Sequence, residues 1–401
     1  MMPVIPVAVT GVGCLCAAGL DFDECSASLF NERRLPTPPT RFTSDHVDPY
    51  PVYEVPESAV PKMTYGPIEL SLTSVLGISA SVQALKDAGW SSDILSTLRV
   101  GVCMGTTVGC TMNNESFYRD FRTGNNPDMA PIKRFLISNP AHAISRKIRC
   151  SGPLLTVVNA CCSGTDAIGI GASWIRHGLC DLVIAGGTDE LCRVTYNGFI
   201  SLMITDPDPC RPFDRNRKGL NLGEGAGAVV MESEPIRQSR KKEPRAFILG
   251  YGTASDAYHL TAPQPDGSGL RKAISQALLL SGKRVSDIGF ISAHGTGTMD
   301  NDRVESRVLH EMMPGVPFFS TKAHTGHTLG AAGAIQAIFT IACLEKNHIP
   351  KSAGFGTPDP DLCSIPNNRD QPASSGIALS ESLAFGGNNS VLIFQKEWYE
   401  P

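Results

Sequence analysis

Two adjacent cysteines stand where an apolar run gives way to a run of small residues. The stretch VVNACCSGTDAIGIGASWI carries Cys161 and Cys162 between a predicted strand and a predicted helix. A helix start offers unpaired backbone N–H groups and a partial positive charge, and both favour a thiolate. Most buried cysteines are inert, but Ala160 and Ser163 with its following glycine predict a tight turn that can expose a thiol. Either thiol is therefore a candidate nucleophile.

Two histidines in small-residue turns are candidates to act beside such a thiol. His294 lies in SAHGTGT after an apolar strand, where Gly295 and Gly297 would let a ligand approach closely. His327 lies in AHTGHTLGAAGA and is expected to open a helix. Burial and the positive end of the helix dipole would then keep its imidazole neutral. A neutral imidazole can donate one hydrogen bond without acting as a general acid.

A lysine and a glycine-rich turn complete the candidate residues. Lys322 follows the strand FFS and is either a solvated surface lysine or a buried partner for Glu305. The turn GGNN after Phe385 either connects two strands or supplies oxyanion-binding N–H groups beside a reactive cysteine. The charged stretch at 211–227 is interpreted, on charge alone, as a solvated loop.

The elements that must position these residues repeat along the chain. Short apolar runs indicate buried strands, with helical patterns between them. Strand, helix and strand are predicted in the first half at 6–13, 75–90 and 99–107, and in the second half at 247–252, 269–282 and 288–298. Each half continues with a strand, a turn and a helix with a Gly/Ala-rich face that lets two helices approach closely, and then closes with a strand. The pattern predicts an internal duplication whose halves meet near 235–244.

The duplication predicts where the candidate residues meet. If a pseudo-two-fold axis relates the halves, their equivalent helix starts face each other, and Cys161 lies opposite the turn that contains His327. The loop of His294 also ends a strand, and open α/β sheets place their sites at strand ends. The first half carries extra residues at about 30–74 and 109–150, which are expected to form caps, interfaces or binding loops.

Composition excludes several classes of protein. The 401 residues are 42% hydrophobic with a formal net charge of −4, which allows a large core and gives no support to nucleic-acid binding. No apolar run is expected to approach the ~18 residues of a membrane span, and the apolar start lacks a basic region and is expected to be a strand. The 13 cysteines are scattered without a CxxC pair. Neither a disulfide framework nor a metal site is expected, and reduced cytoplasmic thiols are the default.

The motifs together resemble those of the β-ketoacyl–acyl carrier protein synthases, condensing enzymes of the thiolase superfamily. The resemblance runs over nearly the whole chain, through VTGVG, NACCSGTDAIG, AGGTDE, RPFDRNRKG, AHGTGTMDNDRVE, STKAHTGHTLGAAGA and AFGGNNSVLIF. Each motif is weak alone, but their order and spacing are specific. The resemblance implies an α/β fold of the thiolase-like, duplicated α/β/α/β/α layered type with mixed five-stranded sheets. It also implies an N-terminal half at 1–235, with the nucleophile, and a C-terminal half at 236–401, with the two histidines.

The resemblance implies roles for the candidate residues. Cys161 is the implied nucleophile and Cys162 its neighbour, while His294 and His327 together bind a malonyl thioester carbonyl and stabilise the enolate left by decarboxylation. Lys322 is the implied active-site lysine, with Glu305 as its ion-pair partner and Asp302 nearby. The remaining implied roles are oxyanion N–H groups at Cys161 and Phe385, a gate at Phe385, hydroxyls for the phosphopantetheine arm at Thr296 and Thr298, and an acyl-pocket position at Val108.

The activity implied by the resemblance is that of an elongating 3-oxoacyl-[acyl-carrier-protein] synthase, in fatty acid or specialised polyene, polyketide or unusual lipid synthesis. Degradative thiolases would have a second catalytic cysteine near the C-terminus, where this chain has AFGGNN, and initiating synthases would have Asn in place of His327. Acyl carrier protein is the implied partner, and no metal or redox cofactor is implied. A homodimer is expected, with the segment around 109–150 near its interface. The alternative is a weakly catalytic or non-catalytic subunit of a condensing heterodimer.

Overall fold

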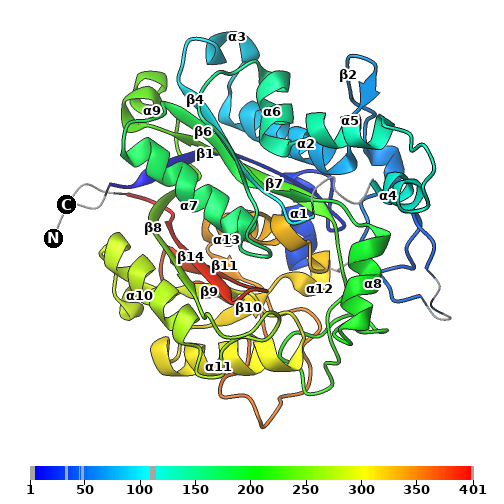
Figure 1. Ribbon diagram of the computed structural model, residues 1–401. Helices are drawn as coiled ribbons and strands as arrows, with labels where there is room; N and C mark the ends of the chain where they lie inside the picture. The colour runs from blue at the N-terminus through cyan, green and yellow to red at the C-terminus, as the bar shows by residue number, and fades with distance from the viewer. Residues whose placement is uncertain (1–4, 32–34, 45, 47–48, 109–113, 399–401) are drawn as a thin grey trace.

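Two sets of five strands form a mixed sheet and repeat the same order (Figure 1). The computed structural model describes residues 5–31, 35–44, 46, 49–108 and 114–398. From the inner to the outer edge, the first set runs β1 (Val7–Cys16), β7 (Gly225–Glu232), β6 (Leu182–Asp189), β4 (Val100–Gly105) and β5 (Leu154–Val157). The second set runs β8 (Ala246–Ser255), β14 (Asn388–Gln395), β13 (Ile377–Ala384), β9 (Phe290–Ala293) and β10 (Phe318–Ser320).

Strand directions repeat as well as strand order. In the first set β4 is parallel to β5 and β6, and β7 is antiparallel to β6 and β1. In the second set β9 is parallel to β10 and β13, and β14 is antiparallel to β13 and β8. A short antiparallel pairing between β1 and β8 joins the two sets. The predicted duplication is therefore confirmed, and its two mixed sets of five strands are joined into one ten-stranded sheet rather than forming two separate sheets.

Two helices contact strands of both sets and form the middle layer. α7 (Ser163–Arg176) contacts β4, β6 and β8, and α13 (Ala332–Lys346) contacts β1, β7 and β13. Glycine permits their close approach. A Cβ at Gly164 would come 2.8 Å from a backbone nitrogen of α13, and a Cβ at Gly333 would come 2.1 Å from a side-chain oxygen of α7. The Gly/Ala-rich pattern correctly predicted this contact.

Helices on the far side of each set complete five layers. α2 (Leu72–Ala88) contacts β1, β6 and β7, while α10 (Ser268–Ser281) contacts β8 and β14 and has α11 (Met299–Met312) beside it. In both contacts, a glycine in the strand lets the helix backbone approach closely. A Cβ at Gly11 would lie 2.2 Å from a backbone oxygen of α2, and a Cβ at Gly250 would lie 2.2 Å from a backbone oxygen of α10. The layers are α/β/α/β/α, as the family resemblance implied.

The first half carries its additional residues in two connections. The segment 30–74 holds η1 (Glu57–Ala59), β2 (Thr64–Tyr65) and β3 (Ile68–Glu69), and the segment 109–150 holds α4 (Glu115–Arg122), α5 (Ala130–Ile137) and α6 (Pro140–Ile148). The remaining elements are α1 (Phe22–Phe30), α3 (Ser92–Leu95), α8 (Arg193–Ser201), α9 (Glu234–Arg240), η3 (Val285–Asp287), α12 (Lys322–Thr325), η4 (Leu329–Ala331), β11 (His348–Ile349) and β12 (Gln371–Pro372).

One stretch of the core is apolar enough to resemble a membrane span. Leu329–Lys346 is 18 residues long with a mean hydropathy of 1.3, so the expectation that no apolar run approaches this length was wrong. However, 89% of the stretch is buried inside the molecule. It consists of η4 and α13, whose apolar residues pack against strands of both sets. Its hydropathy is that of a central core helix.

Candidate active site

Cys161 lies in a tight turn between β5 and α7. Ala160 adopts φ +45°, a left-handed conformation that is rare for residues with a side chain, and Cys162 is the N-cap residue of α7. Cys161 is 6% exposed and lines a cavity of about 280 Å³. The fully buried Cys162 instead directs its Sγ at the main-chain oxygens of Ser382 and Asn388. Of the two thiols, Cys161 is therefore the one that faces the cavity.

Cys161, His294 and His327 converge on that cavity. One ligating atom from each of the three side chains lies within 4.8 Å of the other two. The imidazole rings of His294 and His327 meet edge to face, with 5.3 Å between their centroids. Both histidines line the cavity and are otherwise buried. The structure thus brings together, from both halves of the chain, the three residues that the sequence singled out first.

The Nδ1 atom of each histidine has a donor. The backbone N–H of Leu329 donates to Nδ1 of His327 at 3.1 Å, and Nζ of Lys322 lies 3.1 Å from Nδ1 of His294. A backbone N–H and an ammonium group can only donate, so Nδ1 of each ring is an acceptor. Each ring therefore carries its proton on Nε2. Burial, followed by the charge of Lys322, holds the pKa of both imidazoles well below its usual value. Each histidine is thus a neutral Nε2–H donor.

Of the two expected reasons for a neutral His327, burial is confirmed and the helix dipole was wrong. His327 does not open a helix, because α12 ends before it and η4 and α13 begin after it. Its backbone N–H donates to the carbonyl of Asn221 at 2.8 Å, and its carbonyl accepts the N–H of Gly223 at 3.0 Å. The low pKa follows from burial and from Lys322 rather than from a helix dipole.

Lys322 is buried and is therefore not the solvated surface lysine that was one of its two predicted alternatives. Burial lowers its pKa to about 8, against the attraction of Glu305 and Cys161, which raises it. Its Nζ contacts both Nδ1 and the main-chain oxygen of His294. The direct ion pair expected with Glu305 is not among the contacts of these two described residues. The Glu305 carboxylate instead accepts the N–H groups of His294 and Gly295, at 2.5 and 2.8 Å.

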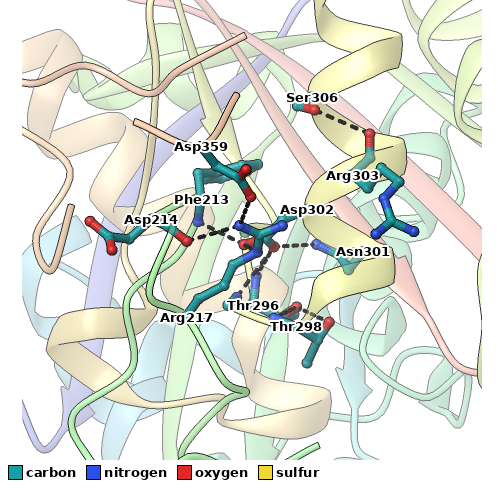
Figure 2. A network of polar contacts seen from close by, with 12 residues as sticks. Phe213, Asp214, Arg217, Thr296, Thr298, Asn301, Asp302, Arg303, Ser306 and Asp359 are labelled. Carbon is teal, nitrogen blue, oxygen red and sulfur yellow. Dashed lines mark hydrogen bonds and ion pairs between the residues drawn. The ribbon is translucent and has the colours of Figure 1, made fainter. Parts of the chain in front are cut away.

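Asp302 fixes the loop that follows His294 (Figure 2). Its carboxylate accepts the N–H groups of Thr296 at 3.1 Å and Gly297 at 3.2 Å. The predicted strand at 288–298 consequently ends early, at Ala293. Beyond that residue the backbone N–H groups turn to the carboxylates of α11 instead of a neighbouring strand. This loop is the one that carries His294 and the two threonines.

Arg217 forms a buried ion pair with Asp302. It lies in the stretch interpreted as a solvated loop, yet its side chain is only 1% exposed, so that interpretation was wrong for this residue. Its Nε is 3.5 Å from Oδ2 of Asp302, and its Nη1 is 2.6 Å from Oδ2 of Asp359 (Figure 2). The same Oδ2 of Asp302 accepts the N–H of Phe213 at 2.7 Å. Burial raises the pKa of Asp302 to about 6.

Phe385 contributes both a backbone donor and a ring. Its backbone N–H is directed at the thiol of Cys161, and the Cys161 N–H also favours the thiolate. Burial nevertheless dominates and raises the pKa of Cys161 to about 11, although Lys322 lowers it. The helix start alone therefore does not produce a low pKa. The Phe385 ring stacks on Phe199 with 5.5 Å between centroids.

Thr296 and Thr298 line the same cavity as Cys161. Their hydroxyl oxygens are 2.8 Å apart and hydrogen-bonded to each other. Lys218 and Asn301 also line this cavity. The cavity beside Cys161 therefore has polar as well as apolar walls.

Family models match the chain on both sides of this site. The model for "Beta-ketoacyl synthase, N-terminal domain" matches residues 5–235, and that for "Beta-ketoacyl synthase, C-terminal domain" matches residues 245–356.

The chain belongs to the β-ketoacyl synthase family.

Individual proteins agree with the family. The "3-oxoacyl-[acyl-carrier-protein] synthase 2" of Staphylococcus aureus (strain COL) is 34% identical over 333 residues, which are 80% of each chain. The solved structure titled "The ishigamide ketosynthase/chain length factor" superimposes with a TM-score of 0.90 at 31% identity, covering 99% of this chain and 100% of that one. A type II PKS acyl-carrier protein complex with its ketosynthase gives a TM-score of 0.88 at 25% identity, covering 98% and 100%.

One predicted position of this β-ketoacyl synthase lies apart from the site. Val108 is half-buried after β4 and is not among the residues that line the cavity of Cys161. Its apolar lining includes Phe199, Met203, Ile204, Leu220, Met299, Leu383 and Phe385 instead. The cavity of the single chain therefore gives no support to Val108 as an acyl-pocket residue.

Among the residues that the structure describes, two groups of side chains in the synthase are close enough to hold a metal ion. One is the Cys161, His294 and His327 cluster, and the other consists of the buried thiols of Cys14, Cys16 and Cys25. Zinc accepts thiolate and imidazole ligands. The expectation of no metal site therefore stays a prediction.

Several residues that orient the synthase site were not found from the sequence. Leu329 acts through its backbone N–H, which no residue pattern reveals. Asn301 links the two carboxylates of α11, with its Nδ2 3.1 Å from Asp302 and 2.9 Å from Glu305. The i, i+3 spacing of those carboxylates on one helix was the available signal.

Proposed function

We propose that this chain is an elongating 3-oxoacyl-[acyl-carrier-protein] synthase. The observation that carries the proposal is the meeting of the Cys161 thiol with two neutral Nε2–H donors, from His294 and His327, in one cavity. A thiol supplies a nucleophile for acyl transfer, and neutral donors can hold an oxyanion without giving up a proton. The names of the relatives support the same reaction class.

In the proposed acylation, the thiolate of Cys161 attacks the thioester carbonyl of an acyl carrier protein. The tetrahedral oxyanion accepts hydrogen bonds from the backbone N–H groups of Cys161 and Phe385. The phosphopantetheine thiolate then leaves and takes up the proton that Cys161 released on forming its own thiolate, and the acyl group remains on Cys161. Lys322 favours the thiolate by its charge and holds His294 through Nδ1.

In the proposed condensation, a malonyl carrier enters past the hydroxyls of Thr296 and Thr298. Nε2–H of His294 and of His327 donate to its thioester carbonyl oxygen, and loss of CO2 leaves an enolate on that oxygen. The enolate carbon attacks the acyl carbon on Cys161 and expels the thiolate, giving a 3-oxoacyl carrier. Asp302 and Glu305 keep the His294 loop in place throughout.

Acyl carrier protein is the proposed partner, and a homodimer is the proposed assembly. The solved complex of a type II PKS acyl-carrier protein with its ketosynthase supports the first. The likeness to a ketosynthase/chain length factor structure favours one alternative, a weakly catalytic or non-catalytic subunit of a condensing heterodimer. A reducing compartment such as the cytoplasm suits the described cysteines, which are all free.

Reconstitution with an acyl carrier and a malonyl carrier tests the proposal. The wild type should form a 3-oxoacyl carrier, detected by mass spectrometry, and Cys161→Ala should not. Failure of the wild type alone, with activity restored by a co-purifying second subunit, would favour the heterodimer alternative. Mass spectrometry of the acyl group retained on Cys161 in the native host would identify the substrate class.

A further inference from the structure

A second buried carboxyl group lies behind the turn of His294. Glu381 on β13 has no exposed surface, and neither of its carboxyl oxygens has a hydrogen-bond donor among the described residues. The parallel register of β13 and β9 pairs Ser380 with Ser292. The next residues along these strands are Glu381 and Ala293, so the carboxyl group lies one residue before the active-site loop.

The side chain of Glu381 faces α11. Residues of the same parity on β13, Leu379 and Leu383, belong to an apolar cluster that includes residues of that helix. Glu305 projects from α11 toward the end of β9, where it accepts the N–H of His294. The carboxyl groups of Glu381 and Glu305 consequently contact each other at the edge of an apolar cluster.

If both carboxyl groups were ionised, neither could donate a hydrogen bond to the other. Carboxylate oxygens only accept, which explains why the Glu381 oxygens have no donor although Glu305 is their neighbour. Two like charges in contact at a buried, largely apolar position also destabilise each other. A single shared proton turns the contact into an O–H···O hydrogen bond. Glu305 already accepts three N–H groups, from His294, Gly295 and Asn301, so Glu381 is the partner that has no other hydrogen bond to make.

We propose that Glu381 is a positioning residue that keeps its proton at neutral pH and donates it in a hydrogen bond to Glu305. It touches no substrate, and it acts by fixing the carboxylate that holds the backbone of His294. Glu305 is the titratable group whose charge affects Glu381. Gln336 on α13 also contacts Glu381, through its main-chain carbonyl, but its side chain is neutral. Burial and the charge of Glu305 raise the pKa of Glu381 well above its usual value.

Infrared spectroscopy of the whole protein tests for the proton without any enzyme assay. Glu381→Gln keeps the shape and an N–H donor but cannot ionise. The wild-type minus Glu381→Gln difference spectrum at pH 7 should contain the C=O band of one neutral carboxylic acid. Loss of carboxylate bands instead would overturn the proposal. Because this measurement needs no substrate, it can succeed or fail independently of the proposed synthase function on which the positioning role rests.

Kinetics then separate positioning from simple folding. Condensation by Glu381→Gln should stay close to wild type, whereas Glu381→Leu, which lacks a donor, should lose about tenfold or more, as is usual for supporting residues. Acylation of Cys161 should be unchanged in both. The ratio of Glu381→Gln to wild-type condensation should rise with alkaline pH, because only the wild-type residue can ionise. A flat ratio, or a Glu381→Leu variant that folds and condenses normally, would refute the positioning role.

Discussion

The backbone N–H of Leu329 donates to Nδ1 of His327 at 3.1 Å, while the corresponding atom of His294 faces the ammonium group of Lys322. Leu329 holds this orientation at φ +51°, a conformation that costs energy for a residue with a side chain. The two imidazoles therefore have the same tautomer for different reasons. One is fixed by a neutral amide and the other by a charge that titrates.

Cys161→Ala should abolish condensation, whereas Cys162→Ser should keep most of it. Cys161 faces the cavity, and the Cys162 Sγ contacts two main-chain oxygens that a serine hydroxyl can also reach. The rate of 3-oxoacyl carrier formation measures the condensation activity of both variants. An inactive Cys162→Ser beside an active Cys161→Ala would reverse the assignment.

His294→Ala and His327→Ala should each lose malonyl decarboxylation while Cys161 can still be acylated. Loss of one oxyanion donor typically lowers a rate by ~10²–10³. Release of CO2 from a malonyl carrier and mass spectrometry of acyl-Cys161 measure the two steps separately. Normal decarboxylation in either variant would remove that histidine from the step. His310→Ala, on α11 away from the cavity lining, is the control.

Lys322→Met should slow alkylation of Cys161 by iodoacetamide. The charge of Lys322 lowers the pKa of Cys161, so its removal raises that pKa and decreases the thiolate fraction. Below pH 8, where Lys322 keeps its charge and the pH is far below the Cys161 pKa of about 11, the wild-type rate should rise about tenfold per pH unit. The difference between wild type and variant should shrink above pH 8, where Lys322 itself loses its proton. Equal rates at pH 7 would contradict the charge effect.

Asp302→Ala should strongly destabilise the fold. It would leave the buried guanidinium of Arg217 without one partner and three backbone N–H groups without an acceptor. Breaking a buried charge pair typically costs about 3–5 kcal/mol. Urea unfolding measures the loss, with Asp300→Ala on the exposed side of α11 as a control that should change little. A similar effect of both substitutions would argue against the anchoring role.

The protein should be a dimer through the β5 edge. β5 is the outer strand of its set, and Leu155 and Val158 are 38% and 67% exposed there. An open strand edge with apolar side chains favours pairing with another chain. Leu155→Lys should therefore weaken the dimer, whereas Leu279→Lys on α10 should not. Light scattering that finds only a 42.8 kDa species for the wild type would contradict this prediction.

The sequence predicted what depends on local pattern. The tight turn at Cys161 was visible from small neighbours, and the duplication was visible because the same order of strand, helix and strand recurs in each half. Interactions between distant charged groups were not visible. Arg217 looked solvated because its partners Asp302 and Asp359 are far away in sequence.

The burial of Glu381 could not be predicted from the alternation of residues along its strand. An acidic residue between serines, as in LSESLAF, gives no sign that Glu381 is buried, because alternating strands usually direct polar residues to solvent. This strand is covered on both faces, so the rule does not hold. Likewise, Lys322 and Glu305 were paired by charge, although the N–H groups of the His294 loop occupy that carboxylate.

Asp302 and Glu305 stand about one turn apart on α11 and bind successive N–H groups of the loop that begins at His294. The number of residues between the histidine and the second carboxylate is thereby fixed. A single insertion or deletion would shift both sets of hydrogen bonds at once. In a chimaera of this chain with a relative, residues 294–305 should therefore be exchanged as one segment, with the crossover points outside it.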